Sequence, residues 1–195
     1  MFVLPLLLLV ASCSNDKLDP LPDNAVILAF GDSLTKGKGV SEVDSYPKVL
    51  SELSGRSVIN AGISGEITTD GLARLPAVLD DTQPDLMILL EGGNDILRNI
   101  NIQTTKSNLA AMIETAHGRG IPVILIGVPE KKLFSDSASI YPELADEHDL
   151  VFDEDLVADL LRNASFKSDA VHLNATGYRA MAEKIHELLN DNGAL

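Results

Sequence analysis

The chain contains no tryptophan, a single cysteine and few basic side chains. Lysine and arginine total 15 against 29 aspartates and glutamates, which gives a formal net charge of −14 at neutral pH. This balance argues against nucleic-acid binding, because phosphates are bound by basic patches. Aromatic residues make up only 4% of the chain, so aromatic stacking platforms are not expected. One cysteine excludes an intrachain disulfide and a CxxC zinc or redox motif.

The length and the hydrophobic content fit one globular domain. The chain has 195 residues, of which 45% are hydrophobic. A chain of this size is long enough to bury a sizeable core but short for two domains. We therefore expect a single domain and look for the segments that flank it.

The first residues, "MFVLPLLLLVASC", resemble a bacterial export signal. The apolar run is too short to span a bilayer as a helix but matches the central region of a signal peptide. It ends in a branched apolar residue, two small residues and Cys13, which resembles the lipobox at which lipoproteins are cut and lipidated. Residues 1–12 hold no lysine or arginine, so an ordinary leader with an incidental cysteine is the alternative. Both interpretations predict an exported protein, either periplasmic or anchored to a membrane through Cys13.

The segment after the leader reads as a spacer. Residues 14–24, "SNDKLDPLPDN", are polar and contain two prolines, a composition typical of linkers. We predict a leader over 1–12, a tether over 13–24 and one domain over 25–195.

From residue 25 onward, apolar runs alternate with helical patterns. Several runs are apolar throughout, as in parallel strands that are covered on both faces. Alternating strands and helices with right-handed crossovers predict an α/β, three-layer, flavodoxin-like fold around a mostly parallel five-stranded sheet. The strands are expected near 25–30, 57–60, 85–91, 122–128 and 150–152. The helices are expected near 45–54, 69–80, 104–118, 138–148 and 174–191.

Small and polar residues follow three of these strands. Residues 31–34 read "GDSL", residues 61–65 read "AGISG" and residues 92–95 read "GGND". The carboxyl ends of parallel strands meet at one edge of the sheet, where the sites of such folds lie. We therefore expect these groups to gather in one functional site.

Ser33 is the candidate nucleophile, and it needs a neighbouring base. Of the four histidines, three have the character of solvent-facing or capping groups, namely His117, His148 and His186. His172 differs, because it lies in a turn-rich segment three residues after Asp169. That spacing lets the carboxylate hold the imidazole while its other nitrogen faces Ser33. The alternative is that Asp169 and His172 merely cap the helix that begins near residue 174.

Acyl transfer also needs hydrogen-bond donors for the oxyanion. The backbone N–H of Ser33, the backbone N–H of Gly62 and the side-chain amide of Asn94 are the candidates. Gly62 could instead serve a tight turn. Asn94 and Asp95 could instead cap a helix.

Four blocks resemble those of the SGNH, or GDSL, hydrolase superfamily, in order and at fitting separations: "GDSL" at 31–34, "NAGISG" at 60–65, "GGND" at 92–95 and "DAVH" at 169–172. Within it, residues 68–80, 91–95 and 140–149 look similar to the bacterial arylesterase and thioesterase I/lysophospholipase group. The resemblance implies a Ser33, His172 and Asp169 triad and an oxyanion hole of Ser33, Gly62 and Asn94. It implies no metal and no cofactor, and a structural role for Asp32 in the local turn.

Two apolar loops bear on the choice of substrate. Apolar residues in two loops could form an acyl groove, which favours a fatty-acyl or aryl ester or a lysophospholipid over a sugar ester. A carbohydrate O-deacetylase and a non-catalytic surface-binding lipoprotein remain alternatives. Lys131 and Lys132 could attract an anionic group or simply be solvated. The groove candidates are Ile63, Ile67, Leu133, Phe134, Ile140 and Tyr141.

Overall fold

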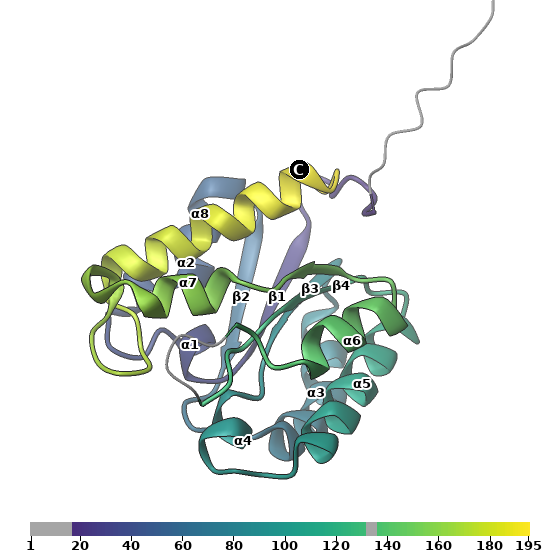
Figure 1. The fold of residues 1–195 in the computed structure, drawn as a ribbon. Coiled ribbons are helices and arrows are strands. Elements are labelled where there is room, and N and C mark those ends of the chain that lie inside the picture. The colour runs from purple at the N-terminus through teal and green to yellow at the C-terminus, as the bar shows by residue number, and fades with distance from the viewer. Residues whose placement is uncertain (1–16, 132–135) are drawn as a thin grey trace, which may run out of the picture.

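A computed structural model describes residues 17–131 and 136–195. The leader, Cys13 and the loop residues 132–135 lie outside the described residues. Five parallel strands form one sheet in the order β2-β1-β3-β4-β5 (Figure 1). This confirms the predicted α/β fold. The strands are β1 (Val26–Gly31), β2 (Ser57–Gly62), β3 (Leu86–Leu90), β4 (Val123–Ile126) and β5 (Val151–Asp153).

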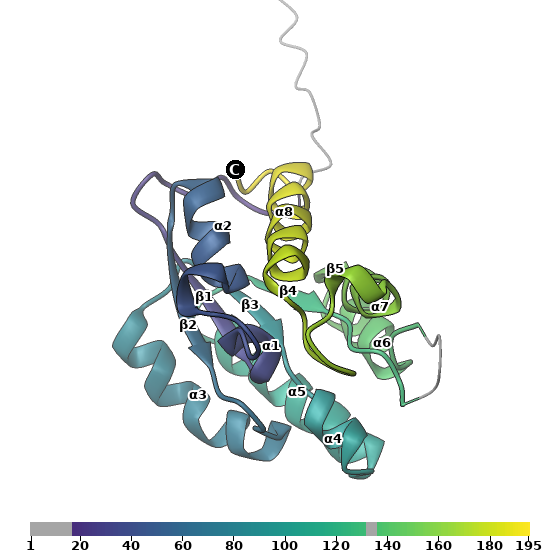
Figure 2. The same ribbon diagram turned by 90° about the vertical axis from the view of Figure 1, so that its left-hand side faces the viewer.

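Helices cover both faces of the sheet. Helix α2 packs against α8, and α8 against α7, on one face, whereas α3, α5 and α6 pack side by side on the other (Figure 2). Two short helices, α1 (Ser33–Lys36) and α4 (Gly93–Leu97), follow the ends of β1 and β3. The longer helices are α2 (Tyr46–Ser54), α3 (Thr68–Thr82), α5 (Ile102–His117), α6 (Ile140–Glu147), α7 (Leu156–Arg162) and α8 (Ala175–Asp191). Two 3₁₀ turns cover Glu42–Asp44 and Ala164–Phe166.

The predicted strands and long helices lie close to the observed ones, because the pattern of apolar residues in each segment reflects which of its faces are buried. All five residues of β3 are buried, as expected of a strand covered on both faces. Three short helices, α1, α4 and α7, were not predicted. Helices of four to seven residues carry too few turns for a clear periodic pattern.

The register places the site at one edge of the sheet. Gly31 at the end of β1 pairs with Gly62 of β2 and with Leu90 of β3. The residues that follow these three strand ends therefore lie together.

The described part of the predicted tether is packed on the domain, which corrects the boundary at residue 25. Leu18 is buried in the core. The Leu18 N–H donates to the Asn192 carbonyl at 3.1 Å, and the Leu21 N–H to the Ala194 carbonyl at 2.9 Å. The Arg56 side chain also donates to the Leu21 carbonyl at 3.2 Å. The described residues from 17 onward thus belong to the packed domain, since two apolar side chains in a polar segment suffice to fix them.

None of the described helices is both long and apolar enough to span a bilayer.

Candidate active site

Ser33 lies where β1 turns sharply into α1. A Cβ atom at Gly31 would lie 1.9 Å from the Leu90 carbonyl oxygen, so only glycine lets the chain pass β3 this closely. Asp32 caps α1, because its Oδ1 accepts the Leu34 N–H at 3.0 Å. Ser33 is then the first residue of the helix, and its N–H is one of the amides that a helix leaves without an internal partner.

The structure brings Ser33, His172 and Asp169 into one hydrogen-bonded line. Ser33 Oγ lies 3.1 Å from His172 Nε2, although the two residues are 139 positions apart. His172 Nδ1 lies 2.7 Å from Asp169 Oδ2. An ionised carboxylate only accepts, so Nδ1 carries the proton and Nε2 is left to accept the Ser33 hydroxyl.

Backbone donors keep Asp169 ionised. Its Oδ1 accepts the N–H groups of Val171 and His172, each at 2.9 Å. The hydrogen bond from Val171, followed by that from the His172 side chain, lowers the pKa of Asp169 to about 2. The carboxylate is therefore charged at neutral pH and holds the imidazole in one tautomer.

The capping alternative for Asp169 and His172 is not what the structure shows. The N-cap of α8 is Asn174, whose side-chain oxygen accepts the Gly177 N–H at 3.0 Å. The Asn174 amide also donates to the Ser165 carbonyl at 2.8 Å. This residue anchors the loop to α8 and leaves Asp169 and His172 to face Ser33.

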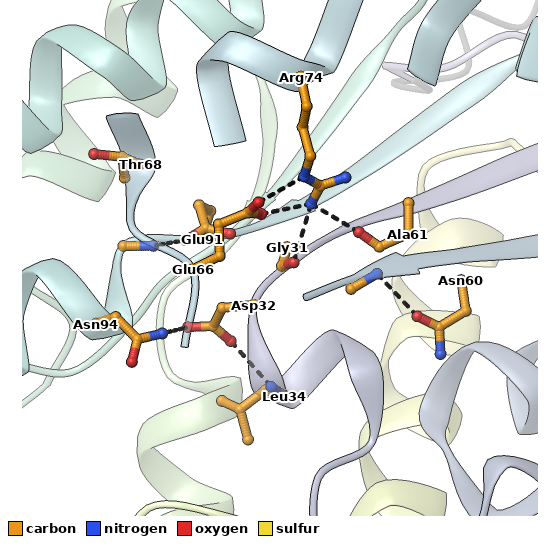
Figure 3. Close-up of polar contacts among 12 residues, drawn as sticks. Gly31, Asp32, Leu34, Asn60, Ala61, Glu66, Thr68, Arg74, Glu91 and Asn94 are labelled. Carbon is orange, nitrogen blue, oxygen red and sulfur yellow. Dashed lines mark hydrogen bonds and ion pairs between the residues drawn. The ribbon is translucent and has the colours of Figure 1, made fainter. Parts of the chain in front are cut away.

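Asn94 lies in the same cavity as Ser33 and His172. Its Nδ2 donates to Asp32 Oδ2 at 3.2 Å, as Figure 3 shows. An amide nitrogen carries two hydrogens, so the second remains for an oxyanion. The alternative role as a helix cap does not apply, since Gly92 is the N-cap of α4.

Gly62 does not join this set, which corrects the prediction. Its N–H donates to the Asn60 side-chain oxygen at 3.0 Å. A Cβ atom at Gly62 would lie 2.1 Å from the Lys36 backbone nitrogen, so α1 covers this strand end. The glycine serves close packing of β2 against α1, and in this geometry it has no free N–H for an oxyanion.

Asp95, next to Asn94, joins α4 to α3. The buried Asp95 carboxylate accepts the Thr68 N–H at 2.8 Å and the Thr68 hydroxyl at 2.6 Å. Asn108 donates to the same Thr68 hydroxyl at 3.0 Å. These contacts fix the helix that carries Asn94 against the start of α3.

An arginine that the sequence analysis did not single out lies beneath the site. Arg74 of α3 forms a two-pronged ion pair with Glu66, at 2.6 Å from Nε and 2.5 Å from Nη2. Its guanidinium also donates to the Ala61 carbonyl at 2.9 Å and lies 3.5 Å from the Gly31 carbonyl (Figure 3). It stacks 3.9 Å from the centroid of the Phe30 ring. One side chain thus ties together the ends of β1 and β2.

Two further acids are buried near the site. Burial raises the pKa of Asp32 to about 6. Burial, and then the charge of Asp32, raises the pKa of Glu91 to about 10, so Glu91 is neutral at pH 7. Its Oε1 accepts the Gly92 N–H at 3.2 Å. Sequence patterns gave no signal for Glu91, because nothing in "LLEGGND" shows that the glutamate points inward.

The cavity beside Ser33 has a volume of about 580 Å³ and mostly apolar walls. One wall is α7, with Val157, Ala158 and Leu161. The groove candidates from the sequence do not form it, because Ile140 and Tyr141 are buried in the core and Ile63 and Ile67 are not among its lining residues. Leu133, Phe134 and Lys132 lie outside the described residues. Lys131 is among the lining residues and donates to the Leu97 carbonyl at 3.1 Å.

The other histidines lie away from this cavity. His117 ends α5 and His148 caps α6, with their rings edge to face at 6.3 Å. His186 lies within α8 beside Asn190. Within 17–131 and 136–195, no group of three His, Cys, Asp or Glu side chains is placed to hold a metal ion.

Comparison with known proteins places the chain in a family. Residues 29–180 match the GDSL-like Lipase/Acylhydrolase family. An arylesterase of Vibrio mimicus is 39% identical over 135 residues, which cover 64% of this chain and 67% of the relative. The thioesterase 1/protease 1/lysophospholipase L1 of Escherichia coli K12 is 33% identical over 179 residues, or 84% and 85%. Among solved structures, the SGNH-hydrolase family esterase AlinE4 matches with a TM-score of 0.66 and 32% identity, over 88% of this chain and 95% of that one.

The resemblance to the SGNH, or GDSL, hydrolases is thereby confirmed, and the four sequence blocks meet at one edge of the sheet. The chain belongs to the GDSL-like lipase/acylhydrolase family and is an esterase of the SGNH hydrolase group.

Proposed function

We propose that the protein cleaves fatty-acyl or aryl esters and thioesters through an acyl-enzyme on Ser33. The observation that carries this proposal is the line from Ser33 Oγ through His172 to Asp169, with contacts of 3.1 and 2.7 Å. Ser33 Oγ attacks the carbonyl carbon and its proton passes to His172 Nε2. His172 then protonates the leaving alcohol or thiol as its bond to the acyl carbon breaks. Water repeats both steps on the acyl-enzyme and frees the acid.

The oxyanion donors we propose are the Ser33 N–H and the Asn94 side-chain amide. Both belong to residues that line the cavity, and Asp32 fixes the Asn94 amide through the 3.2 Å contact. Donors that are fixed before the reaction stabilise the developing charge without reorganisation. The third predicted donor, Gly62, is left out because Asn60 occupies its N–H.

The cavity supports an apolar acyl group. Its walls carry Ile96, Leu97, Val128, Val157 and Leu161, and its volume is that of a small-molecule site. Among the described residues that line it there is no Phe, Tyr or Trp side chain on which a sugar ring could stack. We therefore place fatty-acyl and aryl esters ahead of acetylated carbohydrate.

Two assays test the proposal. A fluorophosphonate probe should label the wild-type protein and not Ser33→Ala, whereas a non-catalytic binding protein would stay unlabelled. A chain-length series of p-nitrophenyl esters, run beside a lysophospholipid and acetylated xylan, should favour the lipid-like esters. A strong preference for acetate on xylan would instead assign the protein as a carbohydrate O-deacetylase.

For the cellular location, we propose export and lipidation at Cys13, on the strength of the signal-like run that ends at this residue. Globomycin treatment should leave an unprocessed precursor that still contains residues 1–12. Unchanged processing would remove the lipid anchor and leave a secreted, unanchored enzyme.

A further inference from the structure

The chain enters the domain at the end opposite the active site. Residues 17–21 lie against the C-terminus, where Leu18 and Leu21 donate to the carbonyls of Asn192 and Ala194. Lys17 pairs with Asp149, just before β5, at 3.1 Å. Because these partners precede strands or follow the last helix, the entry point lies at the amino-terminal edge of the sheet. Ser33 follows the carboxyl end of β1.

The length of helix α8 gives the distance between the chain entry and His172. The helix begins three residues after His172 and ends one residue before Asn192, which holds Leu18. Its seventeen residues span about 25 Å at 1.5 Å per residue. Figures 1 and 2 both show the C-terminal end of α8 at the top of the molecule and α1 and α4 well below it. The catalytic histidine and the chain entry thus lie at opposite ends of one rigid element.

The chain between Cys13 and the domain is short. Three residues separate Cys13 from Lys17, so their Cα atoms lie at most about 15 Å apart, at 3.8 Å per residue. The entry point itself is fixed by the backbone bonds of Leu18 and Leu21 and by the burial of Leu18. A lipid on Cys13 therefore cannot reach round the domain to the cavity.

We propose that lipidation at Cys13 holds the amino-terminal edge of the sheet toward the membrane and the catalytic cavity away from it. The enzyme then acts on esters dispersed in the aqueous phase rather than on lipids of the bilayer that anchors it. This inference rests on the proposed lipidation and narrows the proposed substrate class. Electrostatics oppose this orientation, since Asp19, Asp23 and Asp191 at the anchored end would be repelled by anionic lipid, so the short tether and not surface charge sets it.

The sequence offers a clean test of orientation. Cys13 is the only cysteine, so a maleimide lipid attaches the chain from Cys13 onward to phosphatidylcholine vesicles at the native position, whether or not cells lipidate it. The chain has no tryptophan, so Asp191→Trp and Thr176→Trp each introduce a unique fluorophore at opposite ends of α8. Both positions are exposed. Equal fluorophosphonate labelling of the two variants and the parent verifies that the fold is intact.

Energy transfer from tryptophan to dansyl lipid in the vesicle should be several-fold stronger from position 191 than from position 176, because α8 separates them by about 22 Å. Equal transfer, or stronger transfer from position 176, would overturn the proposed orientation. Whether cells lipidate Cys13 is tested separately, by asking whether the protein fractionates with membranes. A protein that does not would remove the premise of lipidation at Cys13 but would leave the vesicle result unchanged.

Activity gives a second readout. A fluorogenic ester lipid that the enzyme hydrolyses in detergent solution is placed in the tethering vesicles, and about twenty Gly/Ser residues are inserted between Asp16 and Lys17. This linker spans roughly 25 Å on average and more when extended, enough to let the domain turn over. The insertion should raise hydrolysis of the vesicle's own lipid by about tenfold or more, with unchanged hydrolysis of a soluble p-nitrophenyl ester. Equal lipid hydrolysis with and without the linker would contradict the proposal.

Discussion

Asp32 and Asn94 meet through a 3.2 Å hydrogen bond between residues that follow two different strands, β1 and β3. The same carboxylate accepts the Leu34 N–H with its other oxygen. Asp32 therefore receives one donor on each oxygen, one from α1, which carries the proposed nucleophile, and one from the proposed oxyanion donor. This arrangement couples the position of the Asn94 amide to the turn that presents Ser33, beyond the local structural role that the family resemblance implies.

The Asp32→Asn variant tests that coupling. One carboxylate oxygen becomes an NH₂ group, so either the Leu34 N–H or the Asn94 amide faces another donor. Loss of a hydrogen bond to a charged acceptor of this kind costs about 1.5–3 kcal/mol, which corresponds to roughly 10- to 100-fold in kcat. Steady-state kinetics should show this loss in kcat with a much smaller change in KM.

Asn94→Ala provides the comparison for Asp32→Asn. It removes the proposed oxyanion donor itself and should lower kcat by about 10²- to 10³-fold. If Asp32 acts only through Asn94, the Asp32→Asn/Asn94→Ala double variant should be no slower than Asn94→Ala alone. Additive losses would show that Asp32 acts on catalysis by another route.

Ser33→Ala should abolish ester hydrolysis almost completely. Removing the nucleophile of a triad lowers kcat by about 10⁴-fold or more, because the rest of the triad cannot act without it. Ser57→Ala, at an exposed position on β2, is a matched control that should keep full activity. Near-normal turnover by Ser33→Ala on p-nitrophenyl esters would contradict the assignment of the nucleophile.

The sheet could be predicted from the sequence because strands that are buried on both faces are apolar throughout. The run from Leu86 to Leu90 is apolar throughout, and the fold makes it a fully buried central strand. The sequence also predicted that Ser33 and His172 would meet, from the spacing of Asp169 and His172 in the turn-rich segment before the last helix and from the family resemblance, and the two side chains lie 3.1 Å apart.

Details that depend on the direction of a single group could not be read from the chain. Whether the Gly62 N–H points at a substrate depends on the rotamer of Asn60, two residues earlier. Arg74 resembles any solvent-facing residue of a helix until the fold brings Glu66 and two strand-end carbonyls to it. The α7 wall was missed because a seven-residue helix shows barely two turns of periodicity.

Glu91→Gln should stabilise the protein above neutral pH. The pKa of Glu91 is raised to about 10, above its value in the unfolded chain. Its contribution to the free energy of unfolding is therefore fully present below about pH 4.5 and is progressively lost as the pH rises toward 10. An uncharged glutamine of the same shape avoids that cost. Thermal unfolding at pH 8 should show a gain of about 1 kcal/mol or more, or roughly 2–4 °C in Tm.

The same measurement at pH 4 is the control for Glu91→Gln. Both the folded and the unfolded wild-type chains hold Glu91 largely protonated there, so the Tm difference between variant and wild type should shrink toward zero. A stabilisation that is equal at pH 4 and pH 8 would mean that the gain does not come from the ionisation of Glu91.

Arg74→Met tests the ion pair beneath the site. The variant leaves the Glu66 carboxylate, whose side chain is only 4% exposed, without its partner, and it frees the Ala61 carbonyl. Breaking a buried ion pair from one side costs about 3–5 kcal/mol, because the remaining charge stays desolvated. Urea unfolding should therefore show a loss in this range.

The Arg74→Met/Glu66→Gln double variant removes the unpaired buried charge and should recover a large part of the loss. The double variant could instead be as unstable as Arg74→Met. Pairing with Glu66 would then not account for the stability that Arg74 gives to this edge of the sheet. That stability would come from the contacts of the guanidinium with the strand-end carbonyls and the Phe30 ring.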